Sequence, residues 1–109
     1  MYAYKAFKDF KELEEDLNEV ADELVKSVGE GDWKNETIMF YYSLEDYTKY
    51  ELTEGWYIES NLDRDYNGAP NPLHHIDYTS LGNALSNTWD TSCNFLTKNN
   101  EVLTTNHGW

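Results

Sequence analysis

The sequence predicts an α+β domain in which a long N-terminal amphipathic helix packs on an antiparallel β-sheet of about four to five strands, with a short second helix and a C-terminal hairpin. Apolar residues recur with a helical period near the N-terminus, β-branched and aromatic runs follow, and turn-forming residues separate these segments. The chain has 109 residues. Because single domains cluster around roughly 100–150 residues, one compact domain over residues 1–109 is expected.

Apolar residues at steps of three and four predict the N-terminal helix. Asp9 and Glu12 resemble a capping box, so the helix is expected to begin near Phe10. Gly29 suits the left-handed position that ends a helix. The apolar stripe consists of Phe7, Phe10, Leu13, Leu17, Val20, Leu24 and Val28, widened by Ala21 and Val25.

Three strands are expected after this helix. Residues 37–42 form a β-branched and aromatic run, which is typical of a buried strand. Residues 47–52 and 56–59 flank Thr53-Glu54-Gly55, which predicts a hairpin turn. The connections are too short for parallel crossovers, so the strands are predicted to form an antiparallel meander.

A loop and a short helix are predicted next. Residues 61–77 contain an Asn-Gly pair and both prolines, which favours a loop. Asp77 or Thr79 would cap the following helix, although Gly82 counts against it. Its buried positions would be Leu81, Leu85 and Trp89. The predicted C-terminal hairpin consists of residues 93–98 and 101–105 around Asn99-Asn100.

The chain is strongly acidic. It has 8 Lys plus Arg against 21 Asp plus Glu, a net charge of −13, and its pI is near 4.3. This charge argues against direct binding of nucleic acid, which needs a basic face, and against docking on an anionic membrane. Residues 9–65 alone carry the full −13, which indicates a directed acidic surface. The 17 aromatic residues favour a folded domain over an acidic tail.

A cytoplasmic location is expected, in the host cell if the chain is phage-encoded. Cys93 is the single cysteine and cannot close an intrachain disulfide. The first five residues lack the apolar segment of a signal peptide. No apolar run approaches the roughly 18 residues that a membrane span needs.

Two sets of carboxylates are the candidate partner-binding residues. On the N-terminal helix, steps of three and four keep successive acids on the side opposite to the apolar stripe. The second set lies on the predicted strands and turns, so the acidic surface is expected to continue from the helix onto the sheet. The first set is Glu12, Glu15, Glu19, Asp22 and Glu23, and the second is Glu45, Asp46, Glu51 and Glu54.

Tyrosines are the candidate apolar anchors of the same surface. Six lie between residues 41 and 66, which is too many for one small core. Tyr is enriched at protein interfaces because it gives a large contact area at low entropy cost. The alternative is a sheet whose outer face carries aromatic cross-strand pairs. The candidates are Tyr41, Tyr47, Tyr50 and Tyr57.

Metal sites and catalysis are weaker interpretations. The start of a calcium loop is matched by Asp63, Asp65 and Asn67, followed by Gly68. His74 stands where the bidentate Glu is required, so an Asx-rich turn is favoured and no cofactor is expected. A zinc site lacks convergent ligands, because His74 and His75 are adjacent and Cys93 stands alone. No nucleotide-binding or hydrolase motif is present, so the chain is not expected to be an enzyme.

These observations predict an acidic inhibitor that binds the basic nucleic-acid groove of a target protein, with carboxylates in place of backbone phosphates. In charge and length the chain is similar to small phage-encoded anti-CRISPR and anti-restriction proteins that mimic DNA. That resemblance implies a Cas nuclease or restriction enzyme as partner. The alternatives are an immunity protein or antitoxin that caps a basic toxin nuclease, which would use the same electrostatics, and a calcium-binding module through residues 63–68.

Overall fold

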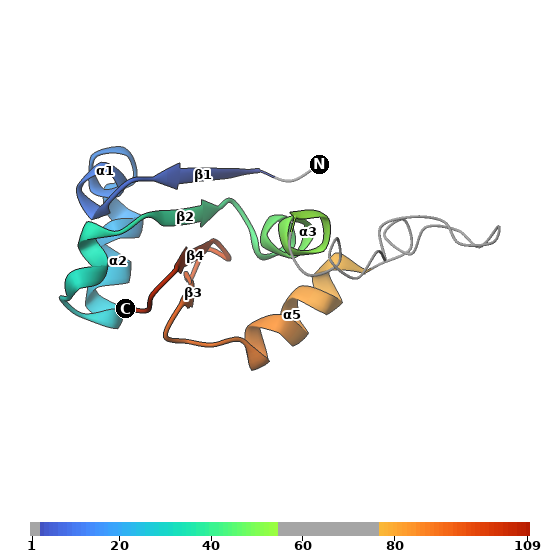
Figure 1. Ribbon diagram of the computed structural model, residues 1–109. Coiled ribbons are helices and arrows are strands. Elements are labelled where there is room, and N and C mark those ends of the chain that lie inside the picture. Colours follow the sequence, from blue (N-terminus) through green and yellow to red (C-terminus); the bar gives the residue numbers. More distant parts are fainter. Residues whose placement is uncertain (1–2, 55–76) are drawn as a thin grey trace.

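The computed structural model describes residues 3–54 and 77–109 (Figure 1). In these residues a four-stranded antiparallel sheet, ordered β1-β2-β4-β3, lies between two layers of helices. The strands are β1 (Tyr4–Phe7), β2 (Ile38–Tyr41), β3 (Asn94–Leu96) and β4 (Val102–Thr105). One layer contains α1 (Phe10–Asp16), α2 (Asn18–Val28) and the 3-10 helix η1 (Asp32–Asn35), and the other contains α3 (Leu44–Glu54) and α5 (Tyr78–Thr88). The predicted mixture of helices with an antiparallel sheet is confirmed.

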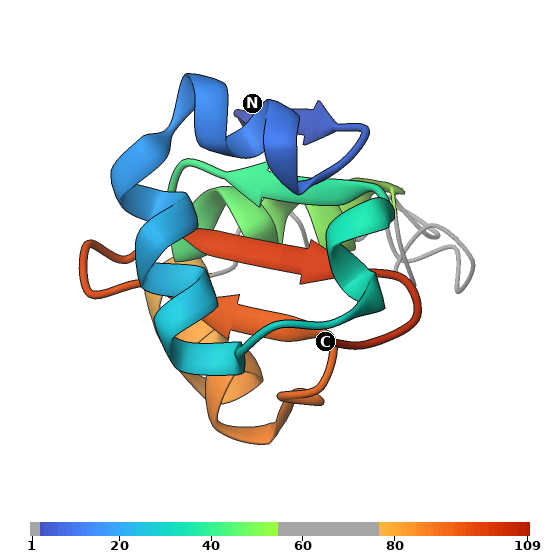
Figure 2. The same cartoon turned by 90° about the vertical axis from the view of Figure 1, so that its left-hand side faces the viewer.

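Strand β2 connects the two cores of the molecule. Its side chains alternate across the sheet. Ile38 and Phe40 pack with α1, α2 and Leu103 of β4, while Met39 and Tyr41 pack toward α3 and α5. Both sides of β2 are covered, as Figure 2 shows for the helices in front of the sheet and behind it. This explains why residues 37–42 form an apolar run without polar alternation.

The prediction of one long N-terminal helix is wrong. The chain leaves the helical conformation at Leu17 (φ −131°, ψ 67°) and starts again as α2. Acidic side chains crowd the last turn of α1, where the helix dipole disfavours negative charge. Asp16 and Asn18 on either side of Leu17 are weak helix formers. The capping prediction holds, because the backbone N–H of Glu12 donates to Asp9 Oδ1 at 2.9 Å.

The predicted strand over residues 47–52 is also wrong, and Thr53 and Glu54 of its predicted turn belong to a helix. Residues 44–54 form helix α3, and its buried residues Leu44, Tyr47, Thr48 and Leu52 are spaced by a helical period. Ser43 caps the helix, because its hydroxyl accepts from the backbone N–H of Asp46 and donates to the Asp46 carboxylate, both at 3.0 Å. The tyrosines and threonines of this segment favour a strand by propensity. The Ser43 cap and the helical spacing of the apolar residues favour the helix that forms.

The predicted short helix and C-terminal hairpin are confirmed, but Leu81, Leu85 and Trp89 are half-buried and Gly82 is the buried residue of α5. Asp77 caps α5 by accepting from the backbone N–H of Ser80 at 3.0 Å, and β3 and β4 form the expected hairpin. Its loop has three residues rather than two, because Thr97 N–H bonds to the Glu101 carbonyl. Asn100 adopts the left-handed conformation (φ 68°) that this loop type requires. Strand β1 was not predicted, and the predicted strand over 56–59 lies outside the described residues.

Candidate interaction surface

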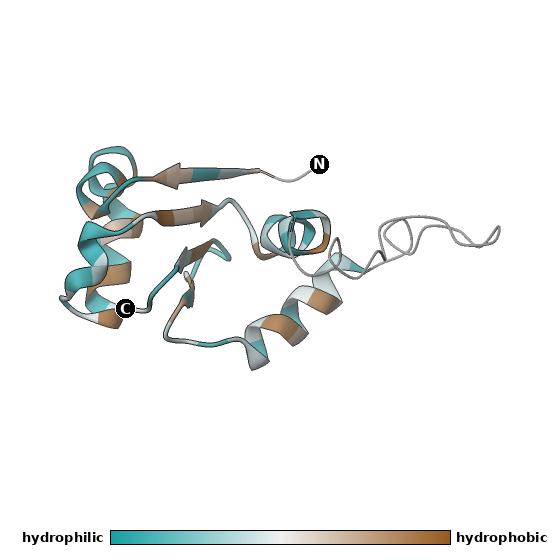
Figure 3. Ribbon diagram, viewed as in Figure 1, coloured by the Kyte–Doolittle hydropathy of each residue, from teal (hydrophilic) through white to brown (hydrophobic). Residues whose placement is uncertain are grey.

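The strongest concentration of charge among the described residues lies on α1 and α2. Residues 9–28 contain eight acids and two lysines, a net charge of −6. Phe10, Leu13 and Leu24 are buried against the sheet, so the acids occupy the outer side of this layer. Figure 3 shows the same division, with hydrophilic colour predominating on α1 and the hydrophobic residues of α2 turned toward the strands.

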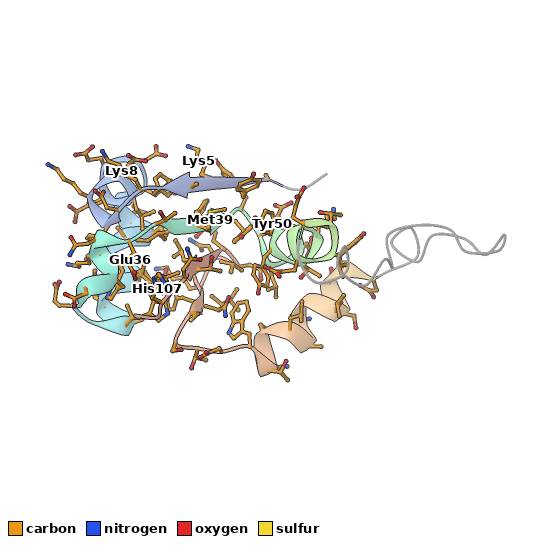
Figure 4. The ribbon with its side chains drawn as sticks, viewed as in Figure 1. Lys5, Lys8, Glu36, Met39, Tyr50 and His107 are labelled. Atoms are coloured by element: carbon orange, nitrogen blue, oxygen red, sulfur yellow. The ribbon has the colours of Figure 1, made fainter. Side chains whose placement is uncertain are left out.

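Three carboxylates of this surface are exposed and form no ion pair with a described residue: Glu14, Glu15 and Glu19. Asp22 is also exposed, but it pairs with Lys26 at 2.9 Å. Asp16 pairs with Lys5 of β1 at 2.8 Å. Pairs this exposed contribute little to stability and leave their carboxylates accessible. Figure 4 shows Lys5 and Lys8 on this side of the molecule, next to α1.

Glu12 and Glu23 have local structural partners. Glu12 is half-buried and accepts from the backbone N–H of Lys8 at 3.4 Å. Glu23 is half-buried and accepts from the backbone N–H of Lys98 at 2.8 Å, which connects α2 to the β3–β4 loop. Of the four glutamates in the first predicted set, Glu15 and Glu19 are therefore exposed, and Glu12 and Glu23 accept hydrogen bonds from backbone N–H groups.

A groove of about 720 Å³ is lined by α2 and the β3–β4 loop. Its walls carry five carboxylates and two lysines, so its lining has a net negative charge. The carboxylates are Asp16, Glu19, Asp22, Glu23 and Glu101, and the lysines are Lys26 and Lys98. The sequence analysis did not identify Glu101 or this groove, because the pairing of α2 with the hairpin loop is a tertiary contact.

The second predicted set of acids does not continue this surface. Glu45, Asp46, Glu51 and Glu54 lie on α3, on the other side of the sheet (Figure 1). Glu45 accepts from the Thr79 hydroxyl at 3.1 Å, and Asp46 belongs to the Ser43 cap. Burial raises the pKa of the half-buried Glu51 carboxyl above its ordinary value. Glu54 is exposed. The expectation of one acidic surface from helix to sheet is therefore wrong for the described residues.

Two of the predicted tyrosine anchors are core residues. Tyr41 is 2% exposed and Tyr47 is 8% exposed, and their rings lie 5.3 Å apart in an edge contact. Burial raises the pKa of both hydroxyls, that of Tyr47 to about 12. Tyr50, labelled on α3 in Figure 4, is half-buried. Its ring centroid lies 5.2 Å from that of Tyr41. Among the described tyrosines, the exposed ones are Tyr4 and Tyr42, which were not among the candidates.

The remaining candidates give no site in the described part of the chain. Tyr57, Asp63, Asp65 and Asn67 lie outside it, as do His74 and His75. Within residues 3–54 and 77–109, no group of three or more His, Cys, Asp or Glu side chains could hold a metal ion. His107 Nδ1 lies 2.5 Å from Glu36 Oε1 at the surface (Figure 4). Cys93 is half-buried, with its sulfur 3.8 Å from the Ser92 hydroxyl.

A scan against protein-family models gives no match to this chain, and searches of curated proteins and of solved structures give none either. No helix in the described residues is long and apolar enough to cross a membrane.

Proposed function

We propose that the chain is an acidic inhibitor that binds the basic nucleic-acid groove of a target protein through α1 and α2. The observation that carries this proposal is the charge of residues 9–28, which is −6, together with Glu14, Glu15 and Glu19, which are exposed and form no ion pair with a described residue. Carboxylates on this surface would occupy the places of backbone phosphates.

The density of charge supports mimicry of a nucleic-acid strand. The 18 helical residues of α1 and α2 amount to about 27 Å of helix axis at roughly 1.5 Å per residue, in two lengths that meet at an angle at Leu17 (Figure 2). These helical residues contain seven acids and two lysines, so their five net charges give about one charge per 5–6 Å of helix axis, against one phosphate per roughly 3.4 Å along one DNA strand. The two spacings agree within a factor of two, which would let lysines and arginines that line a phosphate track meet carboxylates on this surface.

Tyr41 and Tyr47 are left out of the proposed interface because they are buried. A phage or mobile-element origin, with a Cas nuclease or restriction enzyme as target, is part of the proposal and follows from charge and size. A basic toxin nuclease is the alternative target class, since the same electrostatics would serve an immunity protein.

The test begins with affinity capture from a host lysate and identification of the bound protein. The expected partner is a nucleic-acid-binding protein with a basic groove, and duplex DNA should compete with the chain for it. Capture of a partner that binds no nucleic acid, or binding that DNA leaves unchanged, would refute mimicry.

Charge-neutralising variants then locate the surface. Glu14→Gln, Glu15→Gln and Glu19→Gln together should weaken inhibition of the captured target by about ten-fold or more, because several charge pairs of an interface are lost. The matched control is Glu45→Gln, Glu51→Gln and Glu54→Gln, which removes three acids from α3 and should leave inhibition unchanged. Equal inhibition by both triple variants would show that α1 and α2 are not the interface.

A further inference from the structure

Tyr42, the residue that follows β2, presents an exposed aromatic ring. It is 46% exposed, and its ring makes an edge contact with that of Phe40, with 5.0 Å between the centroids. Phe40 is a core residue, 1% exposed. The Tyr42 backbone N–H bonds to the Ala3 carbonyl at 3.3 Å. The ring is therefore held in place before a partner binds, which lowers the entropy cost of using it in an interface.

Tyr42 lies on the same side of the sheet as α1 and α2. Because side chains alternate along a strand, Tyr42 is on the side of Phe40, which packs in the core beneath these helices. Lys5 of β1 stands directly opposite Phe40 in the strand register, so Tyr42 is its diagonal neighbour. Long and aromatic side chains reach each other across this diagonal.

A cation of the chain itself already connects Tyr42 to the acidic surface. The Lys5 ammonium, labelled in Figure 4, pairs with the Asp16 carboxylate at 2.8 Å. Asp16 is the main cause of a raised pKa at Lys5, and Tyr42 contributes to it. Asp16 ends α1 and lines the same groove as Glu19. The position of Lys5 shows that the carboxylate and the aromatic ring together accept a positive charge at this margin of the surface.

An arginine from a partner would fit this position better than Lys5 does. The side chains of Lys5 and Asp16 are 46% and 45% exposed, and ion pairs this exposed contribute little to stability. An arginine guanidinium can donate two hydrogen bonds to one carboxylate and can stack flat on an aromatic ring, whereas a lysine ammonium acts as a point charge.

We infer that Tyr42 and Asp16 bind an arginine of the target protein, which takes the place of Lys5. The guanidinium stacks on the Tyr42 ring while its N–H groups donate to the Asp16 carboxylate. Tyrosine and arginine are also the residue types that most often carry the binding energy of an interface. The inference deepens the proposed function and rests on it, because it names a residue type of the basic groove and the side chains that hold it.

A nucleotide is a poorer occupant of the same position. A base would stack on the Tyr42 ring as an arginine does. Its phosphates, however, would lie beside the carboxylates of α1, in a chain with a net charge of −13. Like charges oppose this association, whereas an arginine is attracted by the same carboxylates.

The test measures affinity for the captured target. Tyr42→Leu keeps an apolar side chain against Phe40 but removes the aromatic face, and it should weaken binding about ten-fold. Tyr42→Phe keeps the ring and should bind like the wild type. The positional control is Tyr4→Leu, since Tyr4 is 44% exposed but its ring lies near that of Tyr41 on the α3 side. This control should also bind like the wild type, and the melting temperature of each free variant verifies that it folds.

Removal of the competing lysine gives a change in the opposite direction. Lys5→Gln leaves Asp16 without its internal partner and should strengthen binding of the target. Lys8→Gln is the matched control, because Lys8 is exposed and forms no ion pair with a described residue. It removes the same charge and should strengthen binding less. Equal effects of the two variants, or equal binding by Tyr42→Leu and the wild type, would overturn the inference.

A titration of the isolated chain identifies the bound group. N-acetylarginine amide should shift the NMR signals of the Tyr42 ring more than N-acetyllysine amide does, since the guanidinium stacks on the ring. Equal shifts with both compounds would overturn the inference. A nucleoside monophosphate that shifts these signals when the arginine compound does not would overturn it in favour of a nucleotide.

The two proposals fail in different ways. If Tyr42→Leu inhibits the target as well as the wild type while the Glu14, Glu15 and Glu19 variant does not, the arginine inference alone fails. If that glutamine variant inhibits fully and Tyr42→Leu does not, phosphate mimicry fails and Tyr42 remains a contact of the target.

Discussion

Gly82 lies where α5 packs closely against α3. A Cβ at this position would lie 2.9 Å from Thr48 Oγ1 and 3.0 Å from Leu44 Cγ. Thr48 is fully buried and its hydroxyl donates to the Leu44 carbonyl at 2.8 Å, so it has little room to move. Glycine is a weak helix former, and Gly82 counted against the predicted helix for that reason. In the structure its missing side chain lets α5 pack closely on α3.

Gly82→Ala should lower the free energy of unfolding by about 1–3 kcal/mol, because overpacking outweighs the roughly 1 kcal/mol gain in helix propensity. Urea unfolding measures the change. Asn83→Ala, at the exposed neighbouring position, is the control and should be neutral or stabilising. A Gly82→Ala chain as stable as the wild type would contradict the close helix contact.

Glu51 predicts a pH dependence of stability. Burial raises its pKa above the ordinary value of 4.5, so the folded chain binds more protons than the unfolded chain between these two pKa values. Stability contributed by this group is therefore lost as pH rises through that window. Glu51→Gln should raise the melting temperature at neutral pH, and the gain should disappear near about pH 4, where both states are protonated.

The control for this prediction is Glu54→Gln, which removes an exposed carboxylate from the same helix. Glu54→Gln changes the net charge of the chain by the same amount as Glu51→Gln, but it removes no buried carboxylate. If the two variants raise the melting temperature by the same amount, the effect comes from net charge and not from the environment of Glu51.

At the scale of elements, α1 carries a glutamate at each end, and the helix dipole acts on the two charges in opposite ways. Glu12 lies in the first turn, where a negative charge complements the helix dipole, and Glu15 lies in the last turn, where it opposes the dipole. Glu12→Gln should destabilise the chain and Glu15→Gln should stabilise it, each by about 0.3–1 kcal/mol. Chemical denaturation of both variants at low salt compares the same substitution at the two ends of one helix. If both variants change the free energy of unfolding in the same direction, the effect comes from the net charge of the chain and not from position along the helix.

The elements also show what the sequence could predict. The Asp9 and Asp77 caps, the period of the core residues in 10–28 and the final hairpin follow from local patterns, and the structure confirms them. The break at Leu17 was missed because the apolar stripe continues across it. Helix α3 was missed because aromatic and β-branched residues predict a strand, while their burial against α5 depends on tertiary contacts.

The candidate site was predictable in composition but not in arrangement. Glu15 and Glu19 are exposed as the helical spacing predicts. Glu23 is bonded by Lys98, 75 residues away, and the α3 acids lie on the opposite side of the sheet. Neither relation can be read from residue spacing, because each depends on which elements meet in the fold.

For the whole molecule, a net charge of −13 has two opposite consequences for the effect of salt. Residues 9–28 alone carry −6, mostly on exposed side chains, so the folded chain repels itself. Added sodium chloride screens this repulsion, since the Debye length is about 8 Å at physiological ionic strength. The melting temperature of the isolated chain should therefore rise with salt.

Association with a basic target should respond in the opposite direction. Attraction between the −6 surface and a phosphate-binding groove speeds the encounter, and salt screens attraction as well as repulsion. The association rate should fall steeply between about 0.01 and 0.15 M sodium chloride, while dissociation changes less. In the variant with Glu14, Glu15 and Glu19 changed to Gln, the association rate should depend less on salt. The α3 control variant should keep more of the wild-type salt dependence, because its acids lie on the other side of the sheet. An association rate that does not depend on salt, measured on a chain whose melting temperature does rise with salt, would show that the acidic surface only solubilises the protein.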